Sequence, residues 1–448
     1  MRVHLIEDND STVLFLPDTL KFFEINSFTK NVIEDMKQGL EDQDICEKHQ
    51  LNVESLNQIK KMIDNKDDRV KLVTAQKEGT LFRLIMNVTN KCNLACKYCY
   101  ANGGNYCSEE NVMCNNMVDE ILNKMYDRYP VIQNLQLFGG EPTLNLDAIE
   151  RVGEFISENY ASGRIKEKPL LGLVTNGTIV NDRFVDLINK YEISVTVSLD
   201  GPEKVNDIMR VYEDGSGTTK VIEENIKILK EKTNQPTGIE ATYNKHHIDQ
   251  DVSVVDVLSY VHDEFKIDNI HIVPAGGDED CDFVAYDRST FVDSVEDIFS
   301  GINGKSVVSY SAINKVVSAL TKRKANKFLC EAGLSVLSVS TKGDVYPCFM
   351  LTDVEAYKMG NIRNDDFFES AGYNSIRKDL SDFSKFEDDK CKDCFNNTVC
   401  SGCLGLNYFE TGNIHEQSDM NCDMYKEMTE QVILQIIKQR KTGKTEAK

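Results

Sequence analysis

Three cysteines stand close together at Cys92, Cys96 and Cys99. They follow the apolar stretch Phe82 to Val88, which predicts a buried strand. A four-iron cluster held by three thiolates keeps one iron free for a further ligand, as a catalytic cluster requires. The same positions also fall on one face of a helix, where they would form a small apolar stripe. The placement after a strand favours an iron-sulfur site in a loop.

The composition is that of a globular protein with more than one domain. A chain of 448 residues exceeds what one hydrophobic core usually supports, and 41% hydrophobic residues supply ample core. No stretch approaches the length of a membrane span, and residues 1–8 lack a secretory signal pattern. A net charge of -22 disfavours nonspecific binding to nucleic acid or to an anionic membrane. We therefore expect a cytoplasmic protein with no nucleic-acid partner and no membrane partner.

Most of the 14 cysteines fall into two groups. The cytosol keeps thiols reduced, so metal or cluster ligation explains them better than disulfides do. Beside the first trio, the second group comprises Cys330, Cys348, Cys391, Cys394, Cys400, Cys403 and Cys422. The remaining cysteines show no ligand spacing and are Cys46, Cys107, Cys114 and Cys281. These last are predicted to be small buried hydrophobic residues.

The first seventy residues predict a small unit of strands and helices. Short strands are expected over 3–7, 12–16 and 21–25, and helices over 29–38, 42–49 and 53–63. The charged residues 64–69 are typical of a linker. A unit this small is marginal alone, so we expect it to dock on the larger domain or to bind a peptide along a sheet edge.

From residue 82 onward, apolar strands alternate with amphipathic helices, which is typical of parallel β/α architecture. Strands are predicted over 82–88, 134–138, 170–175, 193–199, 237–243 and 269–273. Helices are predicted over 115–129, 146–160, 180–190, 220–232 and 252–265, then over 292–302, 312–324 and 422–438. The six strand-helix units indicate a partial barrel.

Ligands bind at the carboxyl ends of strands in parallel β/α folds, and unusual residues collect there. Besides the cysteines, they are Gly139, Gly140, Glu141, Thr175, Asn176, Ser198 and Asp200. Paired glycines permit close approach to a ligand, a glutamate can accept from an ammonium, and the other side chains can bond to a ribose or carboxylate. Together they suit a zwitterionic nucleoside. Arg210 could anchor its carboxylate or form an ordinary surface ion pair.

The CxxxCxxC spacing, with Tyr98 before the last cysteine, resembles the signature of radical S-adenosylmethionine (SAM) enzymes. The resemblance implies that the trio holds a 4Fe-4S cluster whose open iron binds the amino and carboxylate groups of SAM. It implies that Gly139, Gly140 and Glu141 meet the methionine ammonium, and that Tyr98 packs by the adenine or shields the cluster. One-electron cleavage of SAM would give a 5′-deoxyadenosyl radical that abstracts a substrate hydrogen.

The C-terminal cysteines resemble the SPASM domain of peptide-modifying radical enzymes, which carries two auxiliary clusters. The resemblance implies that Cys391, Cys394, Cys400 and Cys422 fully ligate one 4Fe-4S cluster and that Cys330, Cys348 and Cys403 supply the other, for three clusters in all. The family usually has three residues between its last pair, where Cys400 and Cys403 have two. Seven ligands leave one iron open, and that iron could bind a substrate thiolate. Zinc is the alternative for the CxxC pairs.

The order of the regions resembles maturases of ribosomally made peptides, of the thioether-forming sactipeptide or ranthipeptide type. The implied α/β fold has a winged-helix-like leader recognition domain over 1–70, a linker over 71–80, a partial (β/α)6 TIM-like barrel over 81–310, a bridging helix over 311–325, a SPASM domain over 326–425, and a terminal helix and tail over 426–448. The implied partners are a cysteine-containing precursor peptide with a leader, and an electron donor such as flavodoxin or ferredoxin.

Thioether formation between a cysteine sulfur and a carbon of another residue is the leading hypothesis. Carbon-carbon crosslinking of a peptide, or oxidation of a cysteine or serine as in sulfatase maturation, is the second. A noncatalytic iron-sulfur protein that binds peptides belongs to a different class and would not cleave SAM. The sequence singles out no catalytic acid or base, since His246 and His247 are predicted to cap or cover a helix start.

Overall fold

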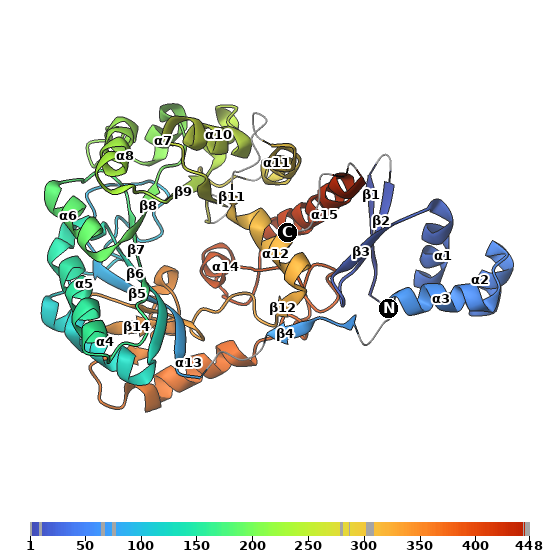
Figure 1. Cartoon of the computed structure of the whole chain (residues 1–448), viewed down its shortest axis with the longest axis horizontal. Helices are drawn as coiled ribbons and strands as arrows, with labels where there is room; N and C mark the ends of the chain where they lie inside the picture. Colours follow the sequence, from blue (N-terminus) through green and yellow to red (C-terminus); the bar gives the residue numbers. More distant parts are fainter. Residues whose placement is uncertain are drawn as a thin grey trace.

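The computed structural model describes residues 2–8, 11–63, 68–73, 78–277, 281–285, 287–301, 309–441 and 443. Figure 1 shows a broad β/α body with the N-terminal unit projecting from one side. The predictions for residues 64–67, 74–77 and 302, and for most of the tail after 441, lie outside the described residues.

The N-terminal unit has the predicted order of elements. They are β1 (His4–Asp8), β2 (Ser11–Leu16), β3 (Lys21–Ile25), α1 (Ser27–Lys37), α2 (Asp42–His49) and α3 (Val53–Ile63). The strands pair antiparallel in the order β1-β2-β3. Asn26 begins α1 by accepting a hydrogen bond from Thr29 N at 2.8 Å. Such side-chain caps fix where a helix starts.

Strand β2 is buried on both faces. Val13 and Phe15 join the main core of the protein, whereas Leu14 and Leu16 form a second cluster with Ile33 of α1. Since alternate residues of a strand point to opposite faces, one face of the sheet packs on the body and the other on its own helices. The N-terminal unit is thus docked, as the sequence predicts.

The partial barrel is confirmed. Its parallel strands follow chain order as β5 (Thr80–Thr89), β6 (Val131–Gly139), β7 (Leu170–Thr175), β8 (Ser194–Ser198), β9 (Gly238–Tyr243) and β10 (Asn269–Pro274). Its helices are α4 (Asn115–Arg128), α5 (Leu146–Ala161), α6 (Asp182–Tyr191), α7 (Glu203–Met209), α8 (Thr219–Thr233), α9 (Lys245–Asp249), α10 (Val254–Phe265) and α11 (Ser289–Ser300). Figure 1 shows them along the outer side of the curved sheet. The short helices α7 and α9 are additions to the predicted pattern.

The cysteine-rich region continues the barrel sheet. Past β5 come β13 (Val336–Val339), which pairs parallel, and then β14 (Asp344–Tyr346) and β15 (Gly360–Asn361), which pair antiparallel. At the other edge β11 (Ser309–Tyr310) pairs parallel with β10. The two regions therefore share one sheet, which fixes the seven C-terminal cysteines relative to the barrel.

The segment predicted as a linker contains a strand. β4 (Lys71–Val73) pairs parallel with β12 (Lys324–Asn326), which directly follows the bridging helix α12 (Ser311–Lys322). Three residues are too few to show an alternating pattern, which is why the sequence did not indicate this pairing.

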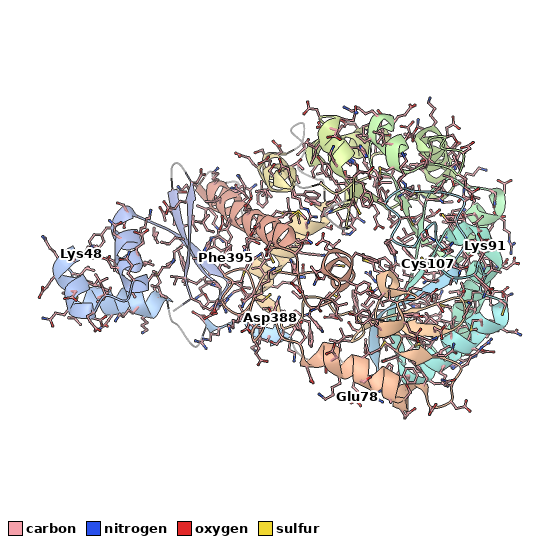
Figure 2. The ribbon with its side chains drawn as sticks, turned by 180° about the vertical axis from the view of Figure 1, so that it is seen from behind. Lys48, Glu78, Lys91, Cys107, Asp388 and Phe395 are labelled. Atoms are coloured by element: carbon pink, nitrogen blue, oxygen red, sulfur yellow. The ribbon has the colours of Figure 1, made fainter. Side chains whose placement is uncertain are left out.

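The C-terminal region also holds α13 (Ala371–Asp382), α14 (Leu404–Thr411) and α15 (Asp419–Lys441). Helix α15 packs against α11, α12 and the N-terminal sheet. His4 of β1 stacks on Phe395 with ring centroids 3.6 Å apart, at the place labelled in Figure 2, and bonds to Glu430 of α15 at 2.6 Å. None of the helices that the structure describes is long and apolar enough to cross a bilayer.

Candidate functional site

The loop after β5 gathers the first three cysteines. Cys92, Cys96 and Cys99 lie in an irregular loop rather than in a helix, which rules out the apolar helical stripe. Lys97 N donates to Met209 O at 3.0 Å and so ties the loop to the end of α7. Burial raises the pKa of Cys92 to about 12, and the nearby Cys96 and Cys99 thiols contribute to the rise. The thiols therefore lie close together, as a shared cluster requires.

Gly139 and Gly140 lie directly against this loop. Gly139 has φ +148°, and a Cβ there would stand 2.0 Å from the carbonyl oxygen of Thr89. A Cβ on Gly140 would stand 2.2 Å from the carbonyl oxygen of Lys91. No side chain fits at these distances, so the glycine pair permits two loops to meet. Its predicted approach to a ligand stays a prediction.

Glu141 is fully buried and connects the loops after β6 and β7. Its Oε1 accepts from Thr143 N at 3.0 Å, from Thr143 Oγ1 at 2.6 Å and from Thr175 Oγ1 at 2.7 Å. Its Oε2 accepts from Asn176 N at 2.7 Å. Burial raises the pKa of Glu141, and these hydrogen bonds act in the opposite direction. The carboxylate thus holds the loops in place, and its contact with an ammonium stays a prediction.

Asn176 reaches the cysteine loop. Its Nδ2 donates to Asn93 Oδ1 at 2.9 Å and lies 3.9 Å from Cys92 Sγ. An amide donor beside a thiolate is the kind of outer contact that orients a metal ligand. Asn176 therefore supports the cysteine trio, and its predicted bond to a ribose is untested.

Arg210 belongs to a buried polar chain. Its side chain is only 8% exposed, and Nη1 donates to the Tyr98 hydroxyl at 2.8 Å. Tyr98 in turn donates to Asp200 Oδ2 at 2.6 Å, and Asp200 Oδ1 accepts from Thr242 N at 2.9 Å. Burial raises the pKa of Tyr98, so the phenol stays protonated and remains a donor.

This burial rules out the surface ion pair as the role of Arg210. Its Nε is buried without a hydrogen-bond partner in the protein. A buried donor without a partner is costly, so this atom is suited to an anionic group of a ligand. Ser198, the other predicted ligand-binding residue, is the last residue of β8 and pairs in register with Glu240 of the adjacent strand β9.

The seven C-terminal cysteines are predicted to form two sets. Burial raises the pKa of Cys348, and Cys403 and Cys330, the other predicted members of its set, contribute to the rise. We call these three cysteines the three-thiol set. Cys403 Sγ also lies 3.7 Å from Met350 Sδ.

The other set comprises Cys391, Cys394, Cys400 and Cys422, the four-thiol set. Burial raises the pKa of Cys422 to about 11, and the neighbouring Cys400 and Cys394 act in the same direction. Burial also raises the pKa of Cys391 to about 12, and Cys400 and Cys422 make smaller contributions in the same direction. These mutual effects agree with the predicted grouping, and the assignment of each group to one cluster stays a prediction.

The donor type and number in these sets fit iron-sulfur clusters. Within the described part of the chain, no three or more His, Cys, Asp or Glu side chains form a group that could hold a metal ion. A four-iron cluster takes its thiolates at separate corners, farther apart than the ligands of a single ion. Bound clusters would be held by the trio, the three-thiol set and the four-thiol set.

The prediction that the remaining cysteines are small buried hydrophobic residues was wrong for Cys107 and Cys114, which are exposed. Cys46 and Cys281 are half-buried, and Cys46 packs against an apolar cluster of the N-terminal helices. Cys107 lies in a turn with φ +59°, and Cys114 precedes α4 as its N-cap residue. Neither position is part of an apolar face, so nothing draws these thiols into the core.

Two charged residues near the site carried no sequence signal. Lys385 is 2% exposed, and its Nζ donates to the carbonyl oxygen of Cys400 at 2.6 Å. In β9, Ile239 and Ala241 lie on either side of Glu240, and both point to the outer face of the sheet, where they pack in the hydrophobic core. Because alternate residues of a strand point to opposite faces, the Glu240 side chain faces the barrel interior. A lone charged residue in a loop or strand is ordinary in a sequence, and only the fold shows that these two are enclosed. His247 caps α9 through Nδ1, as predicted.

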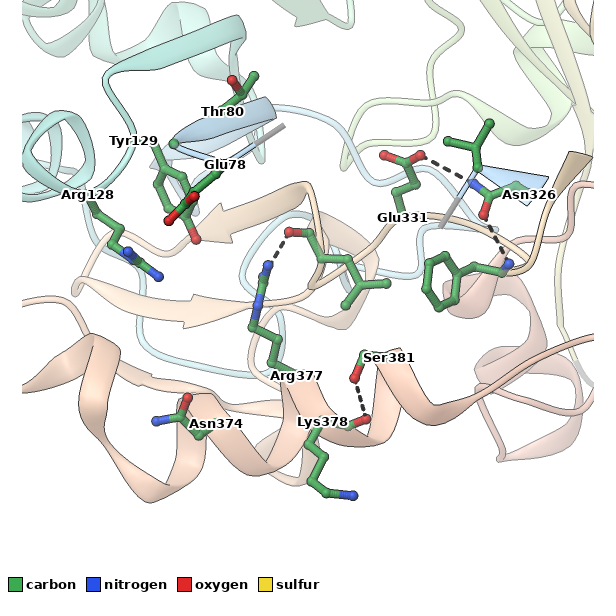
Figure 3. Close-up of a pocket in the computed structure, with 14 residues that line it drawn as sticks. Glu78, Thr80, Arg128, Tyr129, Asn326, Glu331, Asn374, Arg377, Lys378 and Ser381 are labelled. Atoms are coloured by element: carbon green, nitrogen blue, oxygen red, sulfur yellow. Dashed lines mark hydrogen bonds between the residues drawn. The ribbon is translucent and has the colours of Figure 1, made fainter. Parts of the chain in front are cut away.

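A cavity of about 570 Å³ lies at the opposite end of the barrel strands. Thr80, at the start of β5, and Tyr129, just after α4, line one side, and Arg377 of α13 lines another (Figure 3). Arg377 Nη1 donates to the carbonyl oxygens of Gly333 and Leu334, both at 2.8 Å. The cavity is thus remote from the cysteine trio at the carboxyl ends of the strands.

Comparison with known proteins gives two family matches. Residues 86–258 match the radical SAM superfamily, and residues 330–395 match the SPASM iron-sulfur cluster-binding domain. The first range holds the cysteine trio, and the second holds four of the seven C-terminal cysteines.

Several curated proteins are similar to this chain. The radical SAM cyclopropyl synthase TigE of Paramaledivibacter caminithermalis is 25% identical over 84% of this chain and 79% of its own length. A cysteine-type anaerobic sulfatase-maturating enzyme of Clostridium novyi is 26% identical over 72% of this chain and 88% of its own. The uncharacterized protein MJ0907 of Methanocaldococcus jannaschii is 36% identical, but the match spans 35% of this chain and 51% of that protein.

Solved structures agree on the fold. Native anSMEcpe with bound AdoMet superposes with a TM-score of 0.66 at 18% identity, over 80% of this chain and 98% of that one. A superfamily match over the strands around the cysteine trio, followed by a cluster-domain match, shows that the chain contains a radical SAM domain and a C-terminal SPASM domain.

Proposed function

We propose that this enzyme modifies a ribosomally made precursor peptide by forming a thioether between a cysteine sulfur and a carbon of another residue. The proposal includes three 4Fe-4S clusters, of which the one at the three-thiol set has an open iron. The observation that carries it is the difference between that set and the complete four-thiol set. The sequence assigns three cysteines to that set, and the cysteines that raise the pKa of Cys330 and Cys348 are members of the same set.

Aromatic contacts connect the three-thiol set to the cysteine trio. Phe349 follows Cys348, and its ring centroid lies 4.6 Å from that of Phe138 near the end of β6. It also lies 6.2 Å from the ring of Tyr100, which follows Cys99. A thiolate bound at the three-thiol set would therefore lie near the loop that holds the radical-forming cluster.

The proposed roles of the protein side chains follow from this layout. Bound SAM and its cluster supply one-electron cleavage that ends in hydrogen abstraction from the substrate. Arg210 would hold the carboxylate of SAM, because its Nε is buried and unpartnered. Glu141 and Asn176 fix the loops, and the half-buried rings of Phe138 and Phe349 would help to exclude water from the reacting atoms. An electron donor such as flavodoxin or ferredoxin would supply the electron.

Carbon-carbon bond formation or residue oxidation is the second candidate function. It is favoured by the names of the relatives, one a cyclopropyl synthase and another a sulfatase-maturating enzyme. These reactions need no substrate thiolate at an auxiliary iron. A noncatalytic peptide-binding protein would instead leave SAM intact.

Anaerobic reconstitution with iron and sulfide tests the proposal. We expect about twelve irons per chain, and we expect 5′-deoxyadenosine on adding reductant and SAM. With a cysteine-containing precursor, the product should lose two hydrogens and resist thiol alkylation. A product that loses two hydrogens but still alkylates at every cysteine would favour carbon-carbon bond formation or serine oxidation, and a product in which a cysteine sulfur is replaced by oxygen would favour cysteine oxidation. Absence of 5′-deoxyadenosine would contradict both.

The N-terminal unit is proposed to bind the leader of the precursor along the edge of its sheet. β3 is an edge strand, and its Phe23 is 39% exposed. An unpaired strand edge beside an exposed aromatic ring suits an added peptide strand. Phe23→Ala should weaken precursor binding without changing SAM cleavage. Tyr160→Ala is the matched control, because Tyr160 is 45% exposed on the distant helix α5. Equal precursor affinity in both variants would contradict the recognition role.

A further inference from the structure

Lys385 is a buried cation placed among the thiols of the four-thiol set. Its side chain is 2% exposed, and Nζ donates to the carbonyl oxygen of Cys400 at 2.6 Å and lies 5.9 Å from the centroid of the Phe386 ring. Burial lowers the pKa of the Lys385 ammonium, whereas the thiols of Cys400, Cys391 and Cys394 act in the opposite direction. In the described part of the chain, no carboxylate pairs with it.

An isolated buried ammonium is strongly unfavourable unless an opposite charge compensates it. A 4Fe-4S cluster with four thiolates is anionic, and reduction adds another negative charge. In an interior where charges are poorly screened, a nearby cation stabilises the reduced form more than the oxidised form. The charge, burial and position of Lys385 are all explained if such a cluster is its partner.

We propose that Lys385 is the buried counter-charge of the cluster held by the four-thiol set and that it raises the reduction potential of this cluster. The inference rests on the proposed function, since it takes the cluster at that set from it. Lys385 acts here as a tuning residue, because it touches neither substrate nor reacting atoms.

The neighbouring Lys390 offers a matched control. It is also close to the four-thiol set, through Cys422. Its side chain, however, is 40% exposed and pairs with Asp419 at 2.7 Å. Solvent and the carboxylate screen this charge, so removing it should matter little to the cluster.

The test is a redox titration followed by electron paramagnetic resonance. The full chain carries Cys92→Ala, Cys96→Ala and Cys99→Ala, so that only the auxiliary clusters remain. Into it are introduced Lys385→Gln, Lys385→Met, Lys385→Arg and, as the control, Lys390→Met. Iron is counted in each variant after reconstitution and before the titration.

We expect Lys385→Gln and Lys385→Met to shift one auxiliary signal to a more negative potential. A tenfold change in the ratio of reduced to oxidised cluster is about 59 mV for one electron, and we expect at least that shift. The other auxiliary signal should stay in place as an internal reference. Lys385→Arg and Lys390→Met should leave both signals near their starting potentials. Loss of iron in the neutral Lys385 variants alone would also support the counter-charge.

Unchanged potentials in Lys385→Gln and Lys385→Met at full iron content would overturn the inference. An equal shift or equal iron loss in Lys385→Arg would also overturn it, because shape rather than charge would then matter. Failure of the proposed function has a different signature. In that case the chain with an intact Lys385 would itself hold fewer than about eight irons.

Discussion

The two cysteine sets of the C-terminal region differ in completeness and in their neighbours. The four-thiol set is predicted to ligate a cluster fully, and the N-terminal unit contacts it. Arg2 donates to the carbonyl oxygen of Cys394 at 3.2 Å, and His4 stacks on Phe395. The three-thiol set lacks a fourth thiol and has the thioether of Met350 beside Cys403.

Under the proposed function, this difference implies separate roles for the two sets. A fully ligated, buried cluster can accept and pass on electrons but has no position for a substrate. A cluster with an open iron can bind a thiolate, and the aromatic contacts of Phe349 place this set beside the cysteine trio. The complete set lies beside the N-terminal unit instead.

Removing the cysteine trio should have the largest effect. Cys92→Ala, Cys96→Ala and Cys99→Ala together should abolish 5′-deoxyadenosine formation, because no other described site combines three thiols with Arg210 and its buried partners. Both auxiliary sets should survive, so about eight irons per chain should remain. Iron analysis and mass spectrometry measure the two quantities. Continued SAM cleavage would show that an auxiliary set is the catalytic one.

Adding a fourth thiol to the three-thiol set should abolish thioether formation and leave SAM cleavage intact. Met350 Sδ lies 3.7 Å from Cys403 Sγ, so Met350→Cys supplies a fourth thiol at that set. We expect crosslinked product to fall to background while 5′-deoxyadenosine formation continues, because the substrate thiolate loses its iron. Met350→Leu is the control, since it keeps the volume without adding a ligand. If Met350→Cys still forms the thioether, the open iron has no role in it.

Removing the contact that His4 of the N-terminal unit makes with Phe395 should affect only the four-thiol set. His4 Nε2 bonds to Glu430 Oε1 at 2.6 Å, and its ring covers Phe395 beside Cys394. His4→Ala should lower stability by about 1–3 kcal/mol and should speed the chelator-driven loss of about four irons. The matched control is His262→Ala, because His262 makes the same kind of contact with Asp268, also at 2.6 Å. Equal iron release from both variants would argue against a specific support of the cluster.

The docking of the N-terminal unit shows what the sequence could and could not predict. Its strands and helices follow clear periodicities, and all of them were predicted to within two residues of their ends. That Val13 and Phe15 belong to the main core was not predictable, because both faces of β2 are apolar. Deleting residues 1–70 would therefore expose this core, so point substitutions such as Phe23→Ala test leader binding more cleanly.

The barrel and the site show the same limit of prediction from the sequence. The order of β5 to β10 was predictable, because each strand is an apolar run followed by a distinctive turn. β13 to β15 were missed, because they are two to four residues long and pair with distant partners. The cysteine sets followed from the family resemblance. The bonds that occupy Glu141 depend on three loops meeting in space, which spacing along the chain does not reveal.

The exposed cysteines should show the smallest effect and thereby define the baseline for the contrast. Cys107 and Cys114 are exposed, and neither belongs to the cysteine trio, the three-thiol set or the four-thiol set. Cys107→Ser and Cys114→Ser should change stability by no more than about 0.5 kcal/mol, because the substitutions remove no buried contact. Iron content and 5′-deoxyadenosine formation should match those of the unaltered chain. Loss of about four irons in either variant would instead mark that cysteine as the missing ligand of the three-thiol set, and the open iron would then have to be abandoned.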